Sequence, residues 1–448
     1  MGDAIGASAD VAPSRTSCST ATGTTKSSAG GNGTRPSSRS LLGLDSVTFL
    51  MADVRDGVGP YLSVFLSADR HWQPGAIGVA MAASHVAAAI CQVPAGLLVD
   101  SSRFKRTLIS VSGLLVGLGC LLIVLSHGFW PVVAAQALLG AASAVIPPAI
   151  AALSLGIVGR RLLPSRISRN ESFNHAGSFV AAGLAGAFGQ YLSTNWIFYL
   201  VCAFAVASAA AAALIRPNEI DHELARGGES PDNRCEPIPI RSLFGRPGVR
   251  AFLVTCFLFH FGNAAMLPFA GQVLAKTHPG IDTVALSACI ICAQAVMVAV
   301  AWTVGRVMKS GIGRKPIFAV ALAILPVRGV LFSFTTNPVG VVAIQLLDGV
   351  AAGIFGVIAV IIASDLTSGT GRFNLMQGLT ALAVGIGGSM STIVGGYVVQ
   401  WFGFPAGFLL LAAIAAAALG FFFVFMPETG HGSAGDEAGT EALAATEP

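Results

Sequence analysis

The sequence predicts an all-α membrane protein with twelve transmembrane helices arranged as two parallel repeats of six. The first observation is composition: hydrophobic residues make up 54% of the 448 residues, charged residues make up 11%, and the mean hydropathy is +0.74. A soluble chain carries about 25% charged residues, so this chain lacks the charge to cover a water-facing surface. The other two observations are recurring long apolar runs and basic residues that gather in alternate loops.

The apolar runs are long enough to cross a bilayer, which takes about 20 mostly apolar residues per helix. They are continuous rather than alternating, which favours helices over the strands of a barrel. Short polar loops separate them. The expected spans are residues 44–67, 75–99, 107–126, 131–157, 173–192, 194–215, 250–273, 283–305, 316–334, 339–363, 376–400 and 404–426.

Lys and Arg residues follow the second, fourth, sixth and eighth expected helices, whereas the loops on the other side hold only Arg70 and Lys276. By the positive-inside rule, we expect a multi-pass protein of the cell (inner) membrane with both termini in the cytoplasm. The basic clusters are short and lie beside the membrane, so they do not indicate nucleic-acid binding. We expect the lipid bilayer to be the protein's surroundings and the protein to be a monomer.

Two polar tails and one long polar loop divide the chain. Residues 1–40 are rich in Ser, Thr, Gly and Ala and lack the apolar core of a signal peptide, so we expect a disordered cytoplasmic tail. Residues 427–448 form a second tail of this kind. The central loop, residues 216–249, separates an N-terminal half, residues 41–215, from a C-terminal half, residues 250–426.

The two halves share glycine and glutamine positions at a constant offset of 209 residues. A constant offset at three places predicts two parallel repeats, an architecture typical of transporters with a substrate site near the membrane midplane. The matched pairs are Gly96 with Gly305, Gln136 with Gln345, and Gly186 with Gly395.

A Gly-x-x-x-Asp segment followed by basic residues lies after the second helix, and a related segment ending in Gly-Arg-Lys lies after the eighth. With the helix count, the six-plus-six division and the central loop, these segments make residues 41–426 resemble the major facilitator superfamily. Ser101 and Lys309 depart from the family signature. The resemblance implies that the segments latch the helix ends during alternating access, and simple positive-inside charge is the alternative. The residues concerned are Gly96, Asp100, Arg103, Lys105, Arg106, Gly313, Arg314 and Lys315.

Two departures weaken an assignment to the proton-coupled drug exporters that this superfamily includes. Gln136 stands where those exporters carry Arg in helix four, and helix five lacks their Gly-Pro motif. The helix-five glycines, Gly177, Gly183, Gly186 and Gly189, are better explained by close helix packing.

Ionisable residues at bilayer depth are disfavoured by roughly 2.5–3.5 kcal/mol each, which makes them candidates for function. Arg328 in helix nine and Asp348 in helix ten fall at comparable depths and could pair. The resemblance implies that helices one, four, seven and ten line a central cavity. On those helices the candidate substrate or proton-coupling residues are Asp53, Arg55, Asp56, Gln136, His260, Asn263, Gln345 and Asp348.

Three carboxylates, Asp53, Asp56 and Asp348, face two guanidiniums, Arg55 and Arg328, and an unmatched buried carboxylate takes up a proton. We therefore expect Asp53 or Asp56 to carry protons and Arg55 to bind substrate or a counter-ion, with static salt bridges as the alternative. The Gly57-x-Gly59-Pro60 sequence predicts a kink just after these charges, and Pro268 holds the comparable place in helix seven.

These features predict a secondary active transporter for a small organic solute, with proton-coupled efflux as the first hypothesis. An uptake symporter or facilitator for a small organic acid, sugar or metabolite is the second. A receptor or scaffold is disfavoured because the tails are short and simple. The sequence offers no nucleophile–base set, metal spacing or nucleotide-binding loop, so we expect neither an enzyme nor a cofactor. Cys289-Ile-Ile-Cys292 has the spacing of a redox motif, but it lies in the apolar eighth helix, which favours small apolar packing residues.

Overall fold

The computed structural model describes residues 36–429 apart from residues 57, 223, 227–238, 247, 310, 311, 368, 369 and 371. Most of both expected tails and part of the central loop therefore lie outside the described residues, and the domain boundaries stay a prediction. In several helices only the backbone is described at some positions, and these include Asp56 and Asp100.

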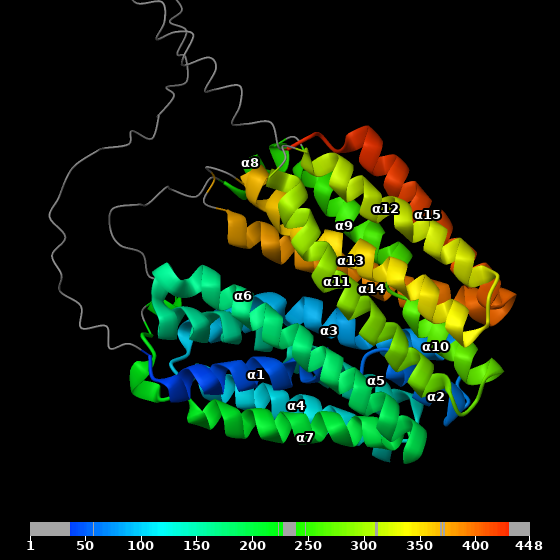
Figure 1. The fold of residues 1–448 in the computed structure, drawn as a ribbon, viewed down its shortest axis with the longest axis horizontal. Coiled ribbons are helices and arrows are strands. Elements are labelled where there is room, and N and C mark those ends of the chain that lie inside the picture. The colour runs from blue at the N-terminus through cyan, green and yellow to red at the C-terminus, as the bar shows by residue number, and fades with distance from the viewer. Residues whose placement is uncertain are drawn as a thin grey trace, which may run out of the picture. The chain divides into compact units, whose positions relative to one another are not determined.

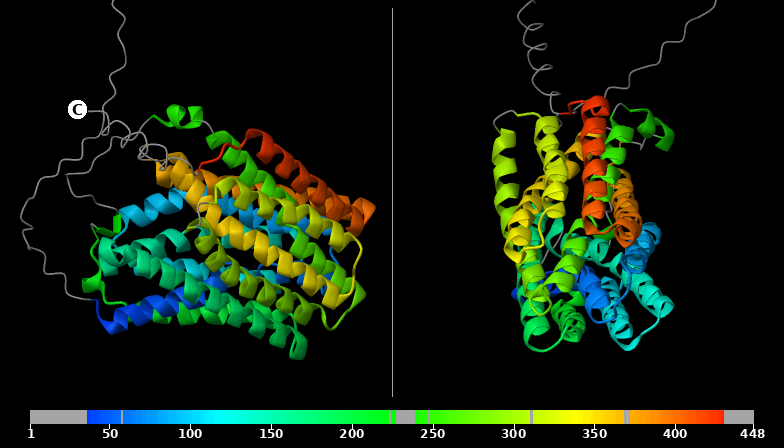
Figure 2. Two further views of the ribbon diagram at one scale, coloured as in Figure 1. Left: turned by 45° about the horizontal axis from the view of Figure 1, so that its top comes forward. Right: turned by 90° about the vertical axis from the view of Figure 1, so that its right-hand side faces the viewer.

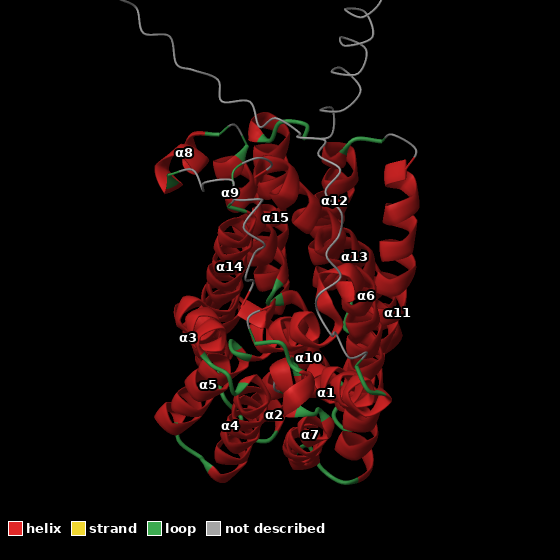
Figure 3. Ribbon diagram, turned by 90° about the vertical axis from the view of Figure 1, so that its left-hand side faces the viewer, coloured by secondary structure: helices red, strands yellow, loops and turns green. Residues whose placement is uncertain are grey.

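The described part of the chain is helical and contains no strand (Figures 1 and 3). The first group of helices is α1 (Ser38–Asp56), α2 (Tyr61–Ala68), α3 (Pro74–Ser101), α4 (Lys105–Leu125), α5 (Phe129–Ser143), α6 (Ile146–Tyr191) and α7 (Asn195–Leu214). Short turns η1 (Pro217–Glu219) and η2 (Leu224–Arg226) and helix α8 (Ile240–Gly245) follow. The second group is α9 (Val249–Asn263), α10 (Met266–Thr277), α11 (Asp282–Lys309), α12 (Arg314–Ser333), α13 (Pro338–Thr367), α14 (Phe373–Phe402) and α15 (Phe404–Phe425).

Ten segments of the described residues are long and apolar enough to cross a membrane. They match ten of the expected spans. The remaining two expected spans are helical but are not among these ten: residues 44–67 are divided between α1 and α2, and residues 173–192 are the last part of α6. Helix α6 runs on from the fourth span into the fifth through Gly159, whose φ of 76° bends it.

Three spans break four residues before a proline. Helix α1 ends at Asp56 before Pro60, α5 gives way at Ala144 before Pro148, and α9 gives way at Ala264 before Pro268. The three breaks have the same cause. A proline ring clashes with the carbonyl of the residue four positions earlier and removes one backbone hydrogen bond. At the first break Gly59 adopts a φ of 46°, which suits glycine. The kink expected in helix one is confirmed, whereas α12 continues unbroken through Pro326.

The internal repeat extends to the contacts between helices. A Cβ atom added to Gly140 on α5 would lie 2.0 Å from the Ser84 carbonyl oxygen on α3. A Cβ added to Gly349 on α13 would lie 2.6 Å from the Ala293 carbonyl oxygen on α11. Gly349 lies 209 residues after Gly140, and Ala293 lies 209 residues after Ser84. Each half therefore contains the same close helix crossing.

Helices α1–α7 pack around one apolar core, and most of α9–α15 pack around another (Figure 1). The two groups meet through α3 with α14, α6 with α11, and α2 with α10 (Figure 2). Glycines allow this approach: a Cβ on Gly78 of α3 would lie 2.1 Å from the Thr392 carbonyl oxygen on α14.

Hydrogen bonds join the two groups near α2 and α10, at the face opposite the start of α1 and the end of α15. The Ser63 hydroxyl donates to the Pro268 carbonyl at 3.0 Å, and the Tyr61 and Ser287 hydroxyls lie 2.7 Å apart. We call this region the closed face, and we call the opposite side of the bundle the chain-end face.

The close crossing at Gly140 gives a direct test of the packing. In Gly140→Ala the added methyl group meets the Ser84 carbonyl, and overpacking of this kind lowers the free energy of unfolding by about 1–3 kcal/mol. The matched control is Gly183→Ala on α6, where a Cβ meets nothing within 4 Å and stability should stay equal or rise. Thermal unfolding of the purified proteins in detergent measures both. Equal melting temperatures for the two variants would contradict this packing.

Candidate functional site

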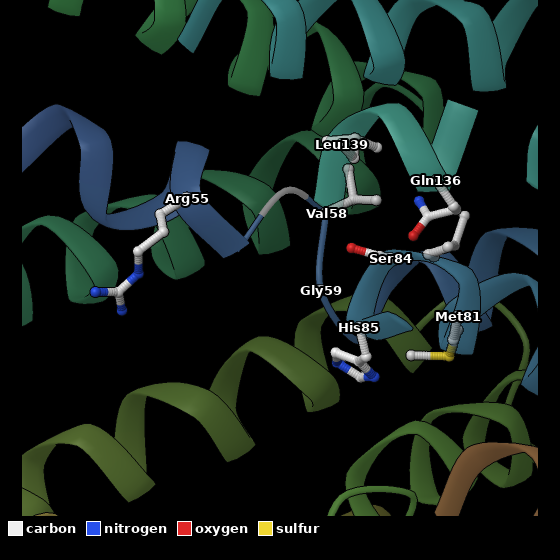
Figure 4. Close-up of a pocket in the computed structure, with 9 residues that line it drawn as sticks. Arg55, Val58, Gly59, Met81, Ser84, His85, Gln136 and Leu139 are labelled. Carbon is white, nitrogen blue, oxygen red and sulfur yellow. The ribbon is translucent and has the colours of Figure 1, made fainter. Parts of the chain in front are cut away.

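The break between α1 and α2 separates two cavities, and charged residues of α1 face both. A small cavity of about 60 Å³ is lined by Arg55, Gly59, Ser84, His85 and Gln136 among others. Figure 4 shows Arg55 on the α1 side of the break, with Gln136 on α5 and Ser84 and His85 on α3 across from it. This cavity is built by the N-terminal helices alone.

The second cavity, of about 180 Å³, receives residues from both groups of helices. Asp53, Tyr61 and Ser178 line it from the N-terminal group, and Ile290 and Gln294 line it from α11. Asp53 and Arg55 thus face different cavities, as residues two apart on a helix do. Of the eight predicted coupling residues, Asp56 is the one whose side chain lies outside the described atoms.

A third cavity, of about 210 Å³, lies along α1 and the two parts of α6. Arg55 lines this cavity as well, together with Asn170, Glu171 and Asn174. Arg55 is therefore the one predicted site residue that lines two of the cavities described here.

In the C-terminal group, three predicted residues gather around Arg328, whose side chain is 1% exposed. Arg328 Nη1 lies 2.7 Å from Asp348 Oδ1 and also donates to Asn263, while Nη2 donates to Gln345 Oε1 at 2.8 Å. The Gln345 amide in turn donates to Asp348 Oδ2 at 2.7 Å. The pairing that the sequence left open therefore exists, and it compensates a guanidinium that burial would otherwise disfavour.

His260 lies beside this cluster in an aromatic setting. Its ring centroid is 4.8 Å from that of Phe355 and 5.2 Å from that of Phe259, and its Nδ1 lies 3.1 Å from the Cys256 carbonyl oxygen. These contacts are ring packing and one backbone hydrogen bond rather than an ion pair.

The predicted gating residues of the first copy support helix ends within their own half. Lys105 is fully buried, and its Nζ donates to the carbonyls of Val99 and Ser102 at 2.9 Å each. Cations suit the carboxyl end of a helix, here that of α3. Arg106 donates to the Ile215 carbonyl, Arg103 is exposed, and Gly96 has open space around it. The Asp100 side chain lies outside the described atoms.

In the second copy, the start of α12 binds a carboxylate that follows α15. The backbone N–H groups of Arg314 and Lys315 donate to Glu428 at 2.8 and 3.1 Å, and a Cβ on Gly313 would lie 2.3 Å from that carboxylate. Arg314 also lies 3.2 Å from Asp365. This arrangement joins the eighth-to-ninth connection to the end of the last helix, with the negative charge at a helix N-terminus.

Two carboxylates that bind near the start of a helix, Glu428 and Glu219, were not predicted from the sequence. Glu219, which is 209 residues before Glu428, accepts hydrogen bonds from the Ser37 backbone N–H at 3.0 Å and hydroxyl at 2.9 Å. The Ser37 backbone N–H holds the pKa of the Glu219 carboxyl below its usual value. The offset of 209 residues, already evident between the halves, was the signal that could have identified the pair.

Among the residues that the structure describes, no group of three or more His, Cys, Asp or Glu side chains lies close enough to hold a metal ion. Arg328 and Asp348 contact each other and the Asn263 and Gln345 side chains.

The sequence was compared with known families and structures. The family model described as Major Facilitator Superfamily matches residues 44–340 and 304–447. The chain belongs to this superfamily. It is accordingly an integral, multi-pass membrane protein that transports a solute, and not an enzyme.

Relatives and solved structures agree with this assignment. Two Mycobacterium tuberculosis proteins, from strains CDC 1551 / Oshkosh and ATCC 25618 / H37Rv, are described as uncharacterized MFS-type transporters. Each is 41% identical over 388 residues, which is 86% of this chain and 93% of the relative. The nucleoside transporter NupG shares 13% identity with a TM-score of 0.66, covering 87% of this chain and 99% of that one. A D-xylose-proton symporter shares 12% identity with a TM-score of 0.67, covering 87% and 97%. The last two likenesses establish the fold alone.

The buried ion pair predicts an asymmetric response to substitution. In Asp348→Asn the Arg328 guanidinium stays buried without its counter-charge, and the free energy of unfolding should fall by about 3–5 kcal/mol. Neutralising both partners in Arg328→Gln with Asp348→Asn should restore part of that loss. Thermal unfolding in detergent measures the single and double variants. A double variant no more stable than Asp348→Asn would contradict the pairing.

Proposed function

We propose that this protein is a proton-coupled secondary active transporter that exports a small organic solute by alternating access. In this proposal it works as a monomer in the cell (inner) membrane, with both termini in the cytoplasm. The observation that carries the proposal is the position of Asp53, which lines a cavity shared by the two groups of helices.

A carboxylate at that interface changes its surroundings whenever the two groups move against each other. Burial disfavours the charged form of a carboxylate and contact with water favours it, so Asp53 would take up a proton in one conformation and release it in the other. Asp348 pairs with Arg328 inside the C-terminal group, away from this shared cavity.

The contacts at the closed face define the conformation that the structure describes. Hydrogen bonds close the bundle between α2 and α10, and the basic loops predict that the chain-end face is cytoplasmic. In this conformation a solute would exchange with the cytoplasm, a step that export and uptake both include. The neighbouring structure named as a D-xylose-proton symporter favours the second candidate, proton-coupled uptake of a small polar solute. The direction of flux under an imposed gradient separates the two candidates.

Replacing the proposed proton carrier should uncouple transport. In Asp53→Asn the amide cannot titrate, so accumulation driven by a pH gradient in proteoliposomes should fall by at least about tenfold. The measurement is uptake of labelled solutes, screened over metabolites and toxic compounds, with and without the gradient. The matched control is Asp69→Asn, the same change at the exposed end of α2, which should transport normally. Gradient-driven accumulation at the wild-type rate in folded Asp53→Asn would refute the role of Asp53.

If the protein works by alternating access, a substitution at the interface between the two groups of helices should change the preferred conformation of the protein. In Gly78→Ala the added methyl group meets the Thr392 carbonyl across the interface and destabilises the conformation with the closed face shut. Spin labels at Asp69→Cys and Thr277→Cys, in a protein without other cysteines, report the distance between the ends of α2 and α10. We expect a longer distance in Gly78→Ala than in wild type or in the Gly183→Ala control. Identical distances would count against opening at this interface.

A further inference from the structure

A larger cavity lies between α3, α13 and α14, where the two groups of helices meet. Its volume is about 320 Å³, and it shares His85 with the small cavity beside Arg55. Sites for small molecules have volumes of about 300–1,000 Å³, so this cavity is large enough for a small organic solute. Two of the helices that form this cavity are α3 and α14. They are not among the four helices that the family resemblance implied for the central cavity.

Two primary amides face this cavity, one from each group of helices: Gln92 on α3 and Gln377 on α14. Both side chains are half-buried, and within the described part of the chain neither amide has a hydrogen-bond partner. A primary amide has two donors and an acceptor oxygen, so each can bind polar groups of a solute. A bound solute with hydroxyl, carbonyl or ring-nitrogen groups would satisfy both amides.

An aromatic ring lies in the same wall. Phe355 on α13 lines the cavity, and its ring stacks on Phe259 with centroids 4.5 Å apart. Phe318 and His260 contact it from other directions, with centroids at 5.7 and 4.8 Å. The ring is thus held in place before any ligand arrives, and a preorganised aromatic surface favours a flat partner.

The lining of this cavity contains no Asp, Glu, Lys or Arg among its thirteen residues. A charged solute placed here would lose its hydration without gaining an opposite charge, which is strongly unfavourable. The polar groups present, two amides, one imidazole and the Thr380 hydroxyl, suit an uncharged molecule.

We propose that this cavity is a substrate subsite for an uncharged molecule that carries a planar ring and several hydrogen-bonding groups. The proposal rests on the proposed transport function and names the class of its substrate. Gln92 and Gln377 bind the polar groups from the two sides of the interface, and Phe355 packs against the ring. Because the amides come from different groups of helices, bound solute bridges the two halves of the transporter.

Glycine at position 356 allows the cavity to be filled without disturbing the fold. A Cβ on Gly356 meets nothing within 4 Å, and the residue lines the cavity. In Gly356→Leu the new side chain should occupy the subsite while helix α13 gains a better helix former. The matched control is Gly420→Leu on α15, at a position equally open but remote from the cavity lining.

The probes are uridine and adenosine, which are uncharged and carry rings, their monophosphates, which add charge, and D-xylose, which lacks an aromatic ring. Binding to the purified protein in detergent is measured by isothermal titration calorimetry. We expect the nucleosides to bind at least about tenfold more tightly than their monophosphates. Gly356→Leu should weaken nucleoside binding by at least about tenfold, and Gln92→Leu or Gln377→Leu by about fivefold each.

Failure of this proposal is distinguishable from failure of the transport mechanism. If neither nucleoside binds more tightly than its monophosphate and D-xylose, or if Gly356→Leu binds like the Gly420→Leu control, the subsite is wrong. Asp53→Asn could still abolish gradient-driven transport in that case, and the coupling mechanism would stand. Conversely, loss of nucleoside binding in Gly356→Leu supports the subsite even if Asp53→Asn stays coupled.

Discussion

The architecture depends on three prolines that interrupt membrane-crossing helices. A helix in a bilayer must satisfy its backbone groups internally, and a proline leaves the carbonyl four residues earlier without its partner. Irregular backbone is tolerated at this depth only where protein or a water-filled cavity surrounds it. The breaks before Pro60 and Pro148 both border cavities, which Gly59 and Ile146 line. The third break, before Pro268, lies where α10 meets α2.

The charged residues of the two groups of helices lie in different surroundings. In the C-terminal group, Arg328 and Asp348 neutralise each other inside one group. Asn263 and Gln345 accept hydrogen bonds from the Arg328 guanidinium, and the Gln345 amide donates to Asp348. In the N-terminal group, Asp53 and Arg55 face separate cavities. A charge that is paired within a rigid group keeps its environment when the halves move, whereas a charge at the interface does not. The proposal that Asp53 carries protons rests on its place in the cavity that both groups line.

Small residues set the geometry of the interface. Gly78 and Gly186 let α3 and α6 approach α14 and α11 closely enough for backbone and side-chain atoms to touch. Nearer the chain-end face, α3 and α14 border the larger cavity with α13, and Gln92 and Gln377 line it from the two groups of helices.

The sequence by itself determined the membrane fold, ten of the spans, the kink in helix one and the repeat, because hydropathy, proline and periodic spacing act along the chain. The tertiary structure decided which partners the charged groups meet. Lys105 binds backbone carbonyls at the end of α3, and Arg328, left outside the predicted site, contacts three members of that site. Gln92, Gln377 and Phe355 carried no signal in the sequence, since neutral residues in apolar helices are common. Their role depends on helix rotation and depth, which only the packing of one helix against another sets.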